Sequence, residues 1–139
     1  MTPEQLVREA LEAMHFAYVP YSGFTVGAAL LTKSGKVYRG CNIENAAYGP
    51  SNCAERTAFF TAIAAGETEF ESIAVVGGKD GVVTDIFPPC GVCRQVMMEF
   101  CDPERFRIVL GKGDLSFREY TLKELLPLGF AGDGVERKE

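Results

Sequence analysis

Three cysteines in two short motifs constrain the fold of this chain more than any other feature. Cys53 stands two residues before Glu55, and Cys90 and Cys93 form a Pro-Cys-x-x-Cys segment farther along. Thiolates are soft ligands that favour zinc in tetrahedral geometry. Both motifs stand where a helix is expected to begin, and helix N-termini lower the pKa of nearby thiols. The fold must therefore bring two helix starts together if the cysteines share one ion.

The number of well-placed ligands indicates a catalytic zinc site. A structural site is closed by four protein ligands, whereas a catalytic site keeps one position for water. Cys41 and Cys101 are spare, but both fit better as ordinary buried cysteines, and the single histidine, His15, lies on the first predicted helix. Glu55 is then the candidate proton shuttle. The alternative is that Asn52 and Glu55 only form a helix cap.

An all-cysteine site needs a source of positive charge. Three thiolates outweigh the charge of Zn²⁺, which weakens the metal as a Lewis acid and hinders ionisation of a bound water. Arg56 lies three residues after Cys53, on the same side of the expected helix, and Arg94 directly follows Cys93. Our hypothesis is that Arg56 hydrogen-bonds the thiolates and offsets their charge.

Length and composition set the domain count and exclude some classes of function. The 139 residues fit one domain, which we expect over residues 1–130, followed by a polar and partly mobile tail over 131–139. The acidic start lacks the features of a signal peptide, and no apolar run is long enough to span a membrane. A cytoplasmic location follows, in which the cysteines stay reduced. The net charge of -5 argues against a nucleic-acid surface.

Hydrophobic periodicity and turn residues predict helices alternating with strands. Helices are expected over 2–18, 53–65, 91–100 and 121–126, strands over 26–32, 37–41, 72–76, 106–110 and 116–120, and a loop over 77–87. Thr2 with Gln5 and Thr121 with Glu124 form capping boxes at two helix starts. The pattern indicates a three-layer α/β/α fold, and the first hairpin makes its sheet, of roughly five strands, mixed.

Several segments together resemble the zinc-dependent cytidine deaminase family, in particular its small, homotetrameric, three-cysteine branch. The matching segments, which lie between the first helix and Phe130, are 21–24, 26–30, 41–46, 53–58 and 89–95. A lone Cys-x-x-Cys would be a weak signal, whereas this combination is specific. The resemblance implies a cytidine deaminase-like fold and one zinc ion per subunit, with Cys53, Cys90 and Cys93 as its ligands.

The family's reaction is hydrolytic deamination of cytidine and deoxycytidine to uridine and deoxyuridine with release of ammonia, a step of pyrimidine salvage. The resemblance implies that an activated water attacks C4 of the ring, while Glu55 moves protons to N3 and then to the leaving amine. Asn42 and Glu44 match the pair that binds the ribose hydroxyls, and an amide with a carboxylate can bind a diol. The alternative is that both residues only form the loop.

Four further residues complete the implied site. Phe24 would pack against the nucleoside, and the backbone of Ala54 would contact the base. Tyr48 and Phe130 match positions that family members lend to the site of a neighbouring subunit, so the resemblance implies a homotetramer with shared active sites. The long segment before Cys90 departs from the family pattern, which leaves open the preference between cytidine, deoxycytidine and analogues.

Three other functions are distinguished by simple features. Deaminases that act on bases within nucleic acid usually carry His-x-Glu and a basic surface, whereas this chain has Cys53 and a net charge of -5. A deaminase of a nucleoside-like antibiotic is disfavoured by the Asn42–Glu44 pair only if its ligand lacks the ribose diol. A non-enzymatic zinc module that binds a protein partner predicts a closed four-ligand site and no need for Glu55.

Overall fold

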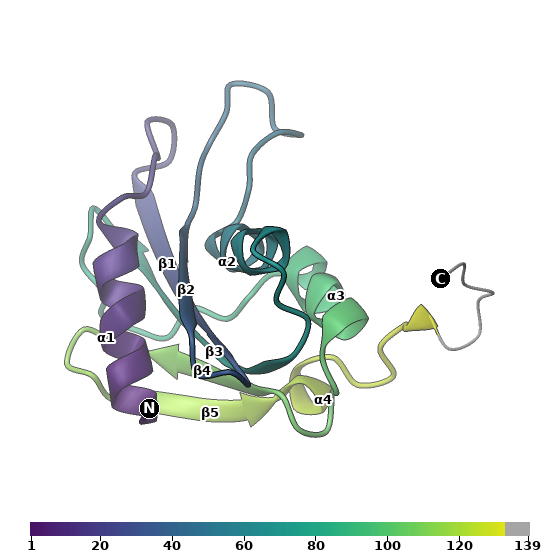
Figure 1. The fold of residues 1–139 in the computed structure, drawn as a ribbon. Helices are drawn as coiled ribbons and strands as arrows, with labels where there is room; N and C mark the ends of the chain where they lie inside the picture. Colours follow the sequence, from purple (N-terminus) through teal and green to yellow (C-terminus); the bar gives the residue numbers. More distant parts are fainter. Residues whose placement is uncertain (133–139) are drawn as a thin grey trace.

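A computed structural model describes residues 1–132 and shows a five-stranded sheet with helices on both faces (Figure 1). The strands are β1 (Phe24–Thr32), β2 (Val37–Cys41), β3 (Phe70–Lys79), β4 (Arg107–Gly111) and β5 (Phe117–Thr121). They are ordered β2-β1-β3-β4-β5, with β3 and β4 parallel and all other neighbours antiparallel. The predicted mixed sheet is confirmed.

The helices cover the two faces of the sheet because successive strand residues point to opposite sides. Helix α1 (Pro3–Met14) packs with Ala29 and Leu31 of β1 on one face. Helices α2 (Ala54–Ala64), α3 (Gly91–Phe100) and α4 (Leu122–Leu125) contribute to a second cluster with Ala28 and Leu30 on the other face. The capping boxes predicted for α1 and α4 both form, and the three-layer α/β/α prediction is confirmed.

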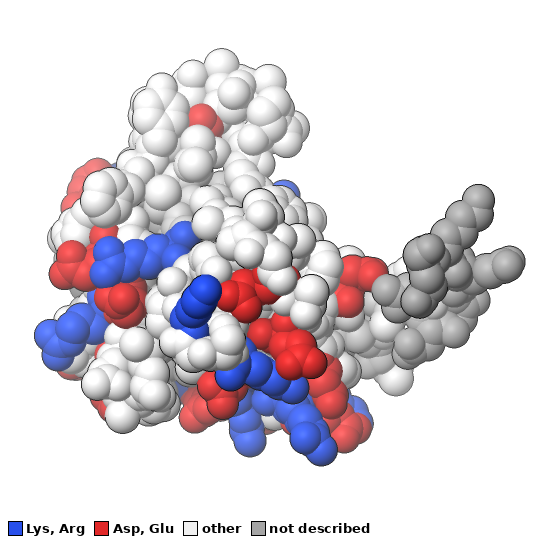
Figure 2. Space-filling model, viewed as in Figure 1, with Lys and Arg blue, Asp and Glu red and all other residues white. Residues whose placement is uncertain are grey.

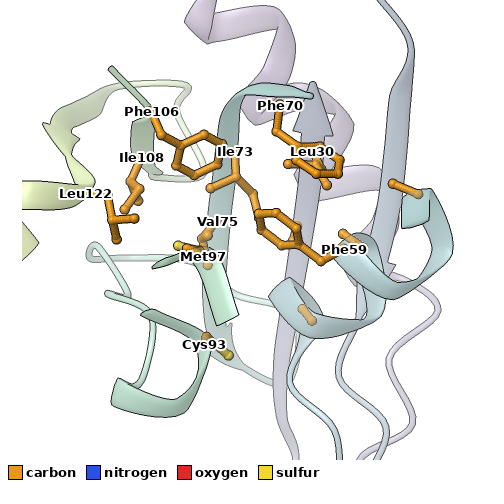
Figure 3. Packing of buried hydrophobic residues seen from close by; sticks show 14 of the residues in the cluster. Leu30, Phe59, Phe70, Ile73, Val75, Cys93, Met97, Phe106, Ile108 and Leu122 are labelled. Atoms are coloured by element: carbon orange, nitrogen blue, oxygen red, sulfur yellow. The ribbon is translucent and has the colours of Figure 1, made fainter. Parts of the chain in front are cut away.

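The larger core cluster supports the side of the sheet that carries α2 and α3. Phe59 of α2 lies at its centre, with its ring centroid 5.1 Å from that of Phe70 and 6.0 Å from that of Phe106 (Figure 3). Cys93, which is 1% exposed, belongs to the same cluster. One predicted zinc ligand is therefore anchored in the core.

A close approach between β2 and α2 fixes where α2 begins. A Cβ atom on Gly40 would lie 2.3 Å from the carbonyl oxygen of Ala54 and 2.5 Å from the amide nitrogen of Ala58. Real Cβ atoms do not come so close to backbone atoms, so only glycine fits in β2 at this point. The fully buried Ala54, Ala58 and Ala62 provide the small helix surface that this contact requires.

Most element boundaries shift by one or two residues, and the two that shift farther do so because long-range backbone pairing decides them. The first helix was expected to reach Tyr18 but ends at Met14, since the Tyr18 amide donates to Asn42 O (3.0 Å) and the Tyr18 carbonyl accepts from Glu44 N (2.9 Å). Tyr18 is 57% exposed and does not extend the buried stripe. The loop expected from residue 77 begins later, because β3 continues to Lys79 and pairs there with Phe24.

Two predictions about chain organisation stay predictions. The tail expected over 131–139 lies, from residue 133 onward, outside the described residues, and nothing tests the single domain expected over 1–130. Within residues 1–132, every helix is too short or too polar to pass through a lipid bilayer.

Candidate active site

The three cysteines of the two motifs converge where α2 and α3 begin. Cys53 is the N-cap of α2, Cys90 is the N-cap of α3, and Cys93 lies in the first turn of α3. Their sulfur atoms all lie within 4.8 Å of one another, with Cys53 Sγ 3.8 Å and Cys93 Sγ 3.5 Å from Cys90 Sγ. Thiolates bound tetrahedrally at about 2.3 Å from one zinc ion lie about 3.8 Å apart, so the cluster fits zinc.

Electrostatics concentrate the first negative charge of this cluster on Cys53. A hydrogen bond from Cys93 and then the Arg56 guanidinium, whose Nη2 is 3.2 Å from Cys53 Sγ, lower the pKa of Cys53 to about 5. The pKa of Cys93 is raised, chiefly because its thiol donates to Cys53 and is buried. A second thiolate is thus disfavoured until a cation shares the site, which is the behaviour of a metal-binding cluster.

Of the two arginines beside the cysteine motifs, Arg56 is the one whose guanidinium hydrogen-bonds a cysteine sulfur. Arg94 donates from Nε to Pro89 O (2.8 Å) and from Nη1 to Leu125 O (2.5 Å), so it links the segment before Cys90 to the end of α4. The positive charge beside Cys53 therefore comes from α2 itself.

Glu55 is buried in the first turn of α2 and has an unpaired oxygen. It is 2% exposed, and Oε1 has no hydrogen-bond partner among the described residues. Burial raises its pKa to about 7. The helix-cap alternative is wrong, because the Cys53 N-cap has no side-chain cap and Asn52 Nδ2 donates to Thr57 Oγ1 instead. A buried carboxyl oxygen without a partner is costly, which indicates a site built to receive a polar group.

A cavity of about 400 Å³ opens over the cysteines and Glu55, and this volume suits a small-molecule ligand. Its walls include nine of the predicted site residues: Phe24, Asn42, Glu44, Tyr48, Cys53, Ala54, Glu55, Arg56 and Cys90. Cys93 lies in the core behind them, and Phe130 does not line this cavity.

The end of the cavity away from the cysteines is held by backbone hydrogen bonds. Asn42 Oδ1 accepts from Val26 N and its Nδ2 donates to Phe24 O, both at 2.9 Å, so the amide is fixed to the start of β1. Glu44 accepts from Tyr21 N, from Ser22 N and from Ser22 Oγ. The Ser22 hydroxyl is the main cause that lowers the pKa of Glu44. Both side chains are thus preorganised.

The two residues that the resemblance assigns to a neighbouring subunit are both largely exposed, although Tyr48 also lines the cavity of its own chain. Tyr48 is 94% exposed and lies on the protruding loop between β2 and α2, where the visible surface is almost uncharged (Figure 2). Phe130 is 66% exposed, and its carbonyl accepts from Gln95 Nε2 at 2.9 Å.

Sequence reasoning missed Phe87 as a cavity residue. Its ring centroid lies 5.0 Å from that of Phe24, and both rings line the cavity. A Cβ atom on Gly77 would lie 2.9 Å from Phe87 Cγ, so a glycine in β3 makes room for the ring. The Gly77–Gly78 pair is typical of a turn, but here it marks a close approach.

A thiolate cluster beside a buried carboxylate, on an α/β/α sheet, defines the class of zinc-dependent hydrolytic deaminases. Residues 1–109 match the family described as cytidine and deoxycytidylate deaminase zinc-binding region, and the chain belongs to this family. It is therefore an enzyme of a hydrolytic family with zinc as its cofactor.

Similar proteins extend the match over nearly the whole chain. The chain is 50% identical, over 97% of its length and 98% of the relative, to a cytidine deaminase from Halalkalibacterium halodurans. A cytidine deaminase crystal structure from Burkholderia pseudomallei has 48% identity and a TM-score of 0.85, covering 94% of this chain and all of that one. The crystal structure of cytidine deaminase from Mycobacterium tuberculosis has 38% identity and a TM-score of 0.79, covering 94% of this chain and 98% of that one. The resemblance inferred from the motifs is confirmed.

Proposed function

We propose that this protein deaminates cytidine and deoxycytidine hydrolytically, giving uridine and deoxyuridine with release of ammonia. The observation that carries the proposal is the buried Glu55 carboxyl group, whose Oε1 has no partner within residues 1–132, beside three sulfur atoms that fit zinc. Relatives of up to 50% identity that are named cytidine deaminases support the substrate class.

The residues of the cysteine end have distinct roles in this reaction. Zinc held by Cys53, Cys90 and Cys93 would polarise a water molecule and lower its pKa. Glu55 takes up a proton of the attacking water, delivers it to ring N3 and carries a second proton to the leaving amine. C4 thus gains oxygen and loses its nitrogen as ammonia. In the zinc-free protein burial raises the pKa of Glu55 to about 7, so this carboxyl group can hold a proton as well as release one.

The other end of the cavity would select a nucleoside. Phe24 packs against the nucleoside, the backbone of Ala54 contacts the base, and Asn42 with Glu44 binds the sugar hydroxyls. Among residues 1–132, Arg56 is the only cationic residue that lines the cavity, and it donates to Cys53 at the opposite end. The Glu44 carboxylate would repel a phosphate. A nucleoside is therefore the substrate, although the family description also covers a nucleotide.

The proposed assembly is a homotetramer in which Tyr48 and Phe130 complete the site of a neighbouring subunit. Their exposed fractions of 94% and 66% support this, because large aromatic side chains gain most when another chain covers them. The enzyme would act in pyrimidine salvage in the cytoplasm, where thiolate ligands stay reduced. Lys and Arg are interspersed with Asp and Glu in Figure 2, which supports a small molecule over nucleic acid as the partner.

Ammonia release and metal content test this function together. We expect the wild type to contain zinc and to form uridine and ammonia in equal amounts from cytidine. Glu55→Ala should keep its zinc and lose roughly 10³-fold in turnover, because proton transfer is removed. A zinc-loaded wild type that releases no ammonia from cytidine or deoxycytidine contradicts the proposed function, and full activity in Glu55→Ala contradicts the role of Glu55.

A further inference from the structure

We infer that Ser22 is a positioning residue that fixes the Glu44 carboxylate to receive a single sugar hydroxyl. The inference rests on the proposed function, in which Glu44 contacts the sugar. Ser22 binds both oxygens of that carboxylate: its amide donates to Oε1 at 3.1 Å, and its hydroxyl donates to Oε2. The Tyr21 amide adds a second donor to Oε1 at 3.1 Å.

The remaining hydrogen-bonding capacity of Glu44 follows from these contacts. An ionised carboxylate offers about four acceptor positions, two on each oxygen. Oε1 already accepts two amides, and Oε2 accepts the Ser22 hydroxyl. One acceptor position is left, on Oε2, so Glu44 receives one hydroxyl of the ligand. A second hydroxyl would be left to Asn42, which keeps one donor and one acceptor after its two bonds to β1.

Ser22 can act in this way because the turn that carries it is itself held. The Phe24 amide donates to Ser22 Oγ at 3.0 Å, which occupies a lone pair and favours an O–H bond directed at Glu44. Lys79 Nζ, at the end of β3, donates to Ser22 O at 2.5 Å, and the Asp80 amide donates to Gly23 O at 2.8 Å. The hydroxyl is thus fixed from the sheet rather than by the loop alone.

The chemistry at this position fits recognition of a sugar. Ser22 and Glu44 both line the cavity, so the remaining acceptor on Oε2 belongs to a site that a ligand can enter. The Ser22 hydroxyl also lowers the pKa of Glu44, which keeps the group an ionised acceptor. A carboxylate held in one orientation gains more from a matching hydroxyl than one that must first be ordered.

The test combines a change in Ser22 with a change in the sugar. We expect Ser22→Ala to raise the KM for cytidine roughly tenfold, with kcat changed less than about threefold, because one charged hydrogen bond is misplaced. The KM for 2′,3′-dideoxycytidine should stay that of the wild type, since this ligand lacks both hydroxyls that Glu44 could receive. Zinc content should not change, and Ser22→Thr, which keeps a hydroxyl, should restore the KM for cytidine.

A serine that also holds a carboxylate, but does not line the cavity, provides the control. Ser116, in the turn between β4 and β5, donates from its amide (2.9 Å) and its hydroxyl (2.5 Å) to Asp114, in this case to the single oxygen Oδ1. Ser116→Ala should leave both KM values unchanged. Equal rises of KM for cytidine and the dideoxy compound in Ser22→Ala would mean that Ser22 only stabilises the turn, and no rise for either would overturn the inference as well.

Calorimetric binding of product nucleosides separates this inference from the proposed activity. Ser22→Ala should weaken binding of uridine roughly tenfold relative to the wild type and leave 2′,3′-dideoxyuridine unaffected. A wild type that binds uridine but does not deaminate cytidine would contradict the proposed function, while the role of Ser22 in positioning Glu44 would still be supported by the binding data. A Ser22→Ala protein that binds uridine like the wild type removes the inference while the function stands.

Discussion

The two ends of the cavity treat a glutamate in opposite ways. Glu55, beside the cysteines, is buried with one oxygen unpaired, and burial raises its pKa to about 7. Glu44, at the other end, accepts three hydrogen bonds, and the Ser22 hydroxyl is the main cause that lowers its pKa. The environment of each group thus makes one carboxyl group suitable for carrying protons and the other a fixed acceptor.

The difference arises from the elements that carry the two residues. Glu55 lies in the first turn of α2, which is pressed against β2 at Gly40, so the helix carries it below the surface. Glu44 lies in an exposed loop, and its backbone amide pairs with Tyr18. The donors to its carboxylate come from Tyr21 and Ser22, in the turn before β1. Changes at Glu55 should therefore affect stability as well as chemistry, whereas changes around Glu44 should affect binding.

The largest expected effect outside catalysis is on the stability of the zinc-free protein. The pKa of Glu55 is about 7 in the folded protein and near the ordinary glutamate value of 4.5 when unfolded, so the folded protein binds the extra proton between these pH values. Stability from this group is full below pH 4.5 and is lost as pH rises through 7. Glu55→Gln has no proton to lose and should be more stable than the wild type by about 3 kcal/mol at pH 8.

Urea unfolding of reduced, zinc-free protein at pH 5, 6, 7 and 8 measures this difference. The gap in unfolding free energy between variant and wild type should widen with pH. Cys53, with its pKa lowered to about 5, acts in the opposite direction but is present in both proteins. Glu44→Gln is the matched control and should show no such gain. If the unfolding free energies of Glu55→Gln and the wild type change with pH in the same way, burial does not raise the pKa of Glu55, and the difference proposed between Glu55 and Glu44 is contradicted.

A smaller effect is expected for the charge beside the sulfur atoms. Arg56→Gln removes the guanidinium that lies 3.2 Å from Cys53 Sγ, so the thiolates keep more negative charge and water ionises less easily. We expect turnover to fall about tenfold, with zinc still bound and KM little changed. Arg39→Gln, which breaks only the surface ion pair with Glu9, should leave turnover unchanged. Full turnover in Arg56→Gln would contradict the role of Arg56.

The cysteine end was predictable because its signals are local. The spacing of Cys90 and Cys93 and the position of Cys53 before a helical pattern place all three sulfur atoms at helix starts, and the structure brings them together. The orphaned oxygen of Glu55 was not predictable in the same way. It depends on the depth at which α2 packs, which Gly40 sets from another element.

The other end was only partly predictable because long-range pairing builds it. Asn42 and Glu44 were found through a family motif, but the partners of Asn42 follow from the register between β1 and β2, which pairs Gly27 with Cys41. The register between β1 and β3 pairs Phe24 with Lys79, whose Nζ donates to the carbonyl oxygen of Ser22. A turn signal such as Gly77–Gly78 cannot show which distant ring will fill the space above it.

Phe87, which lines the cavity together with Phe24, provides the smallest expected effect and the finest test of the comparison. Its ring packs against Phe24 at 5.0 Å and carries no polar group, so it should shape the cavity without taking part in proton transfer. Phe87→Ala should raise the KM for cytidine about fivefold at nearly constant kcat, by loss of ring contacts. Gly77→Ala should act in the same direction, because its Cβ would meet Phe87 Cγ at 2.9 Å.

Steady-state kinetics with zinc analysis measures both variants, and Phe16→Ala is the control, since Phe16 is 75% exposed and does not line the cavity. A fall in kcat larger than the rise in KM would mean that Phe87 supports the chemistry of the cysteine end. Phe87 precedes Cys90 by only three residues, so its ring would then act by orienting that zinc ligand. A rise in KM alone would place it with the binding end, and the boundary between chemistry and recognition would run between Phe87 and Cys90.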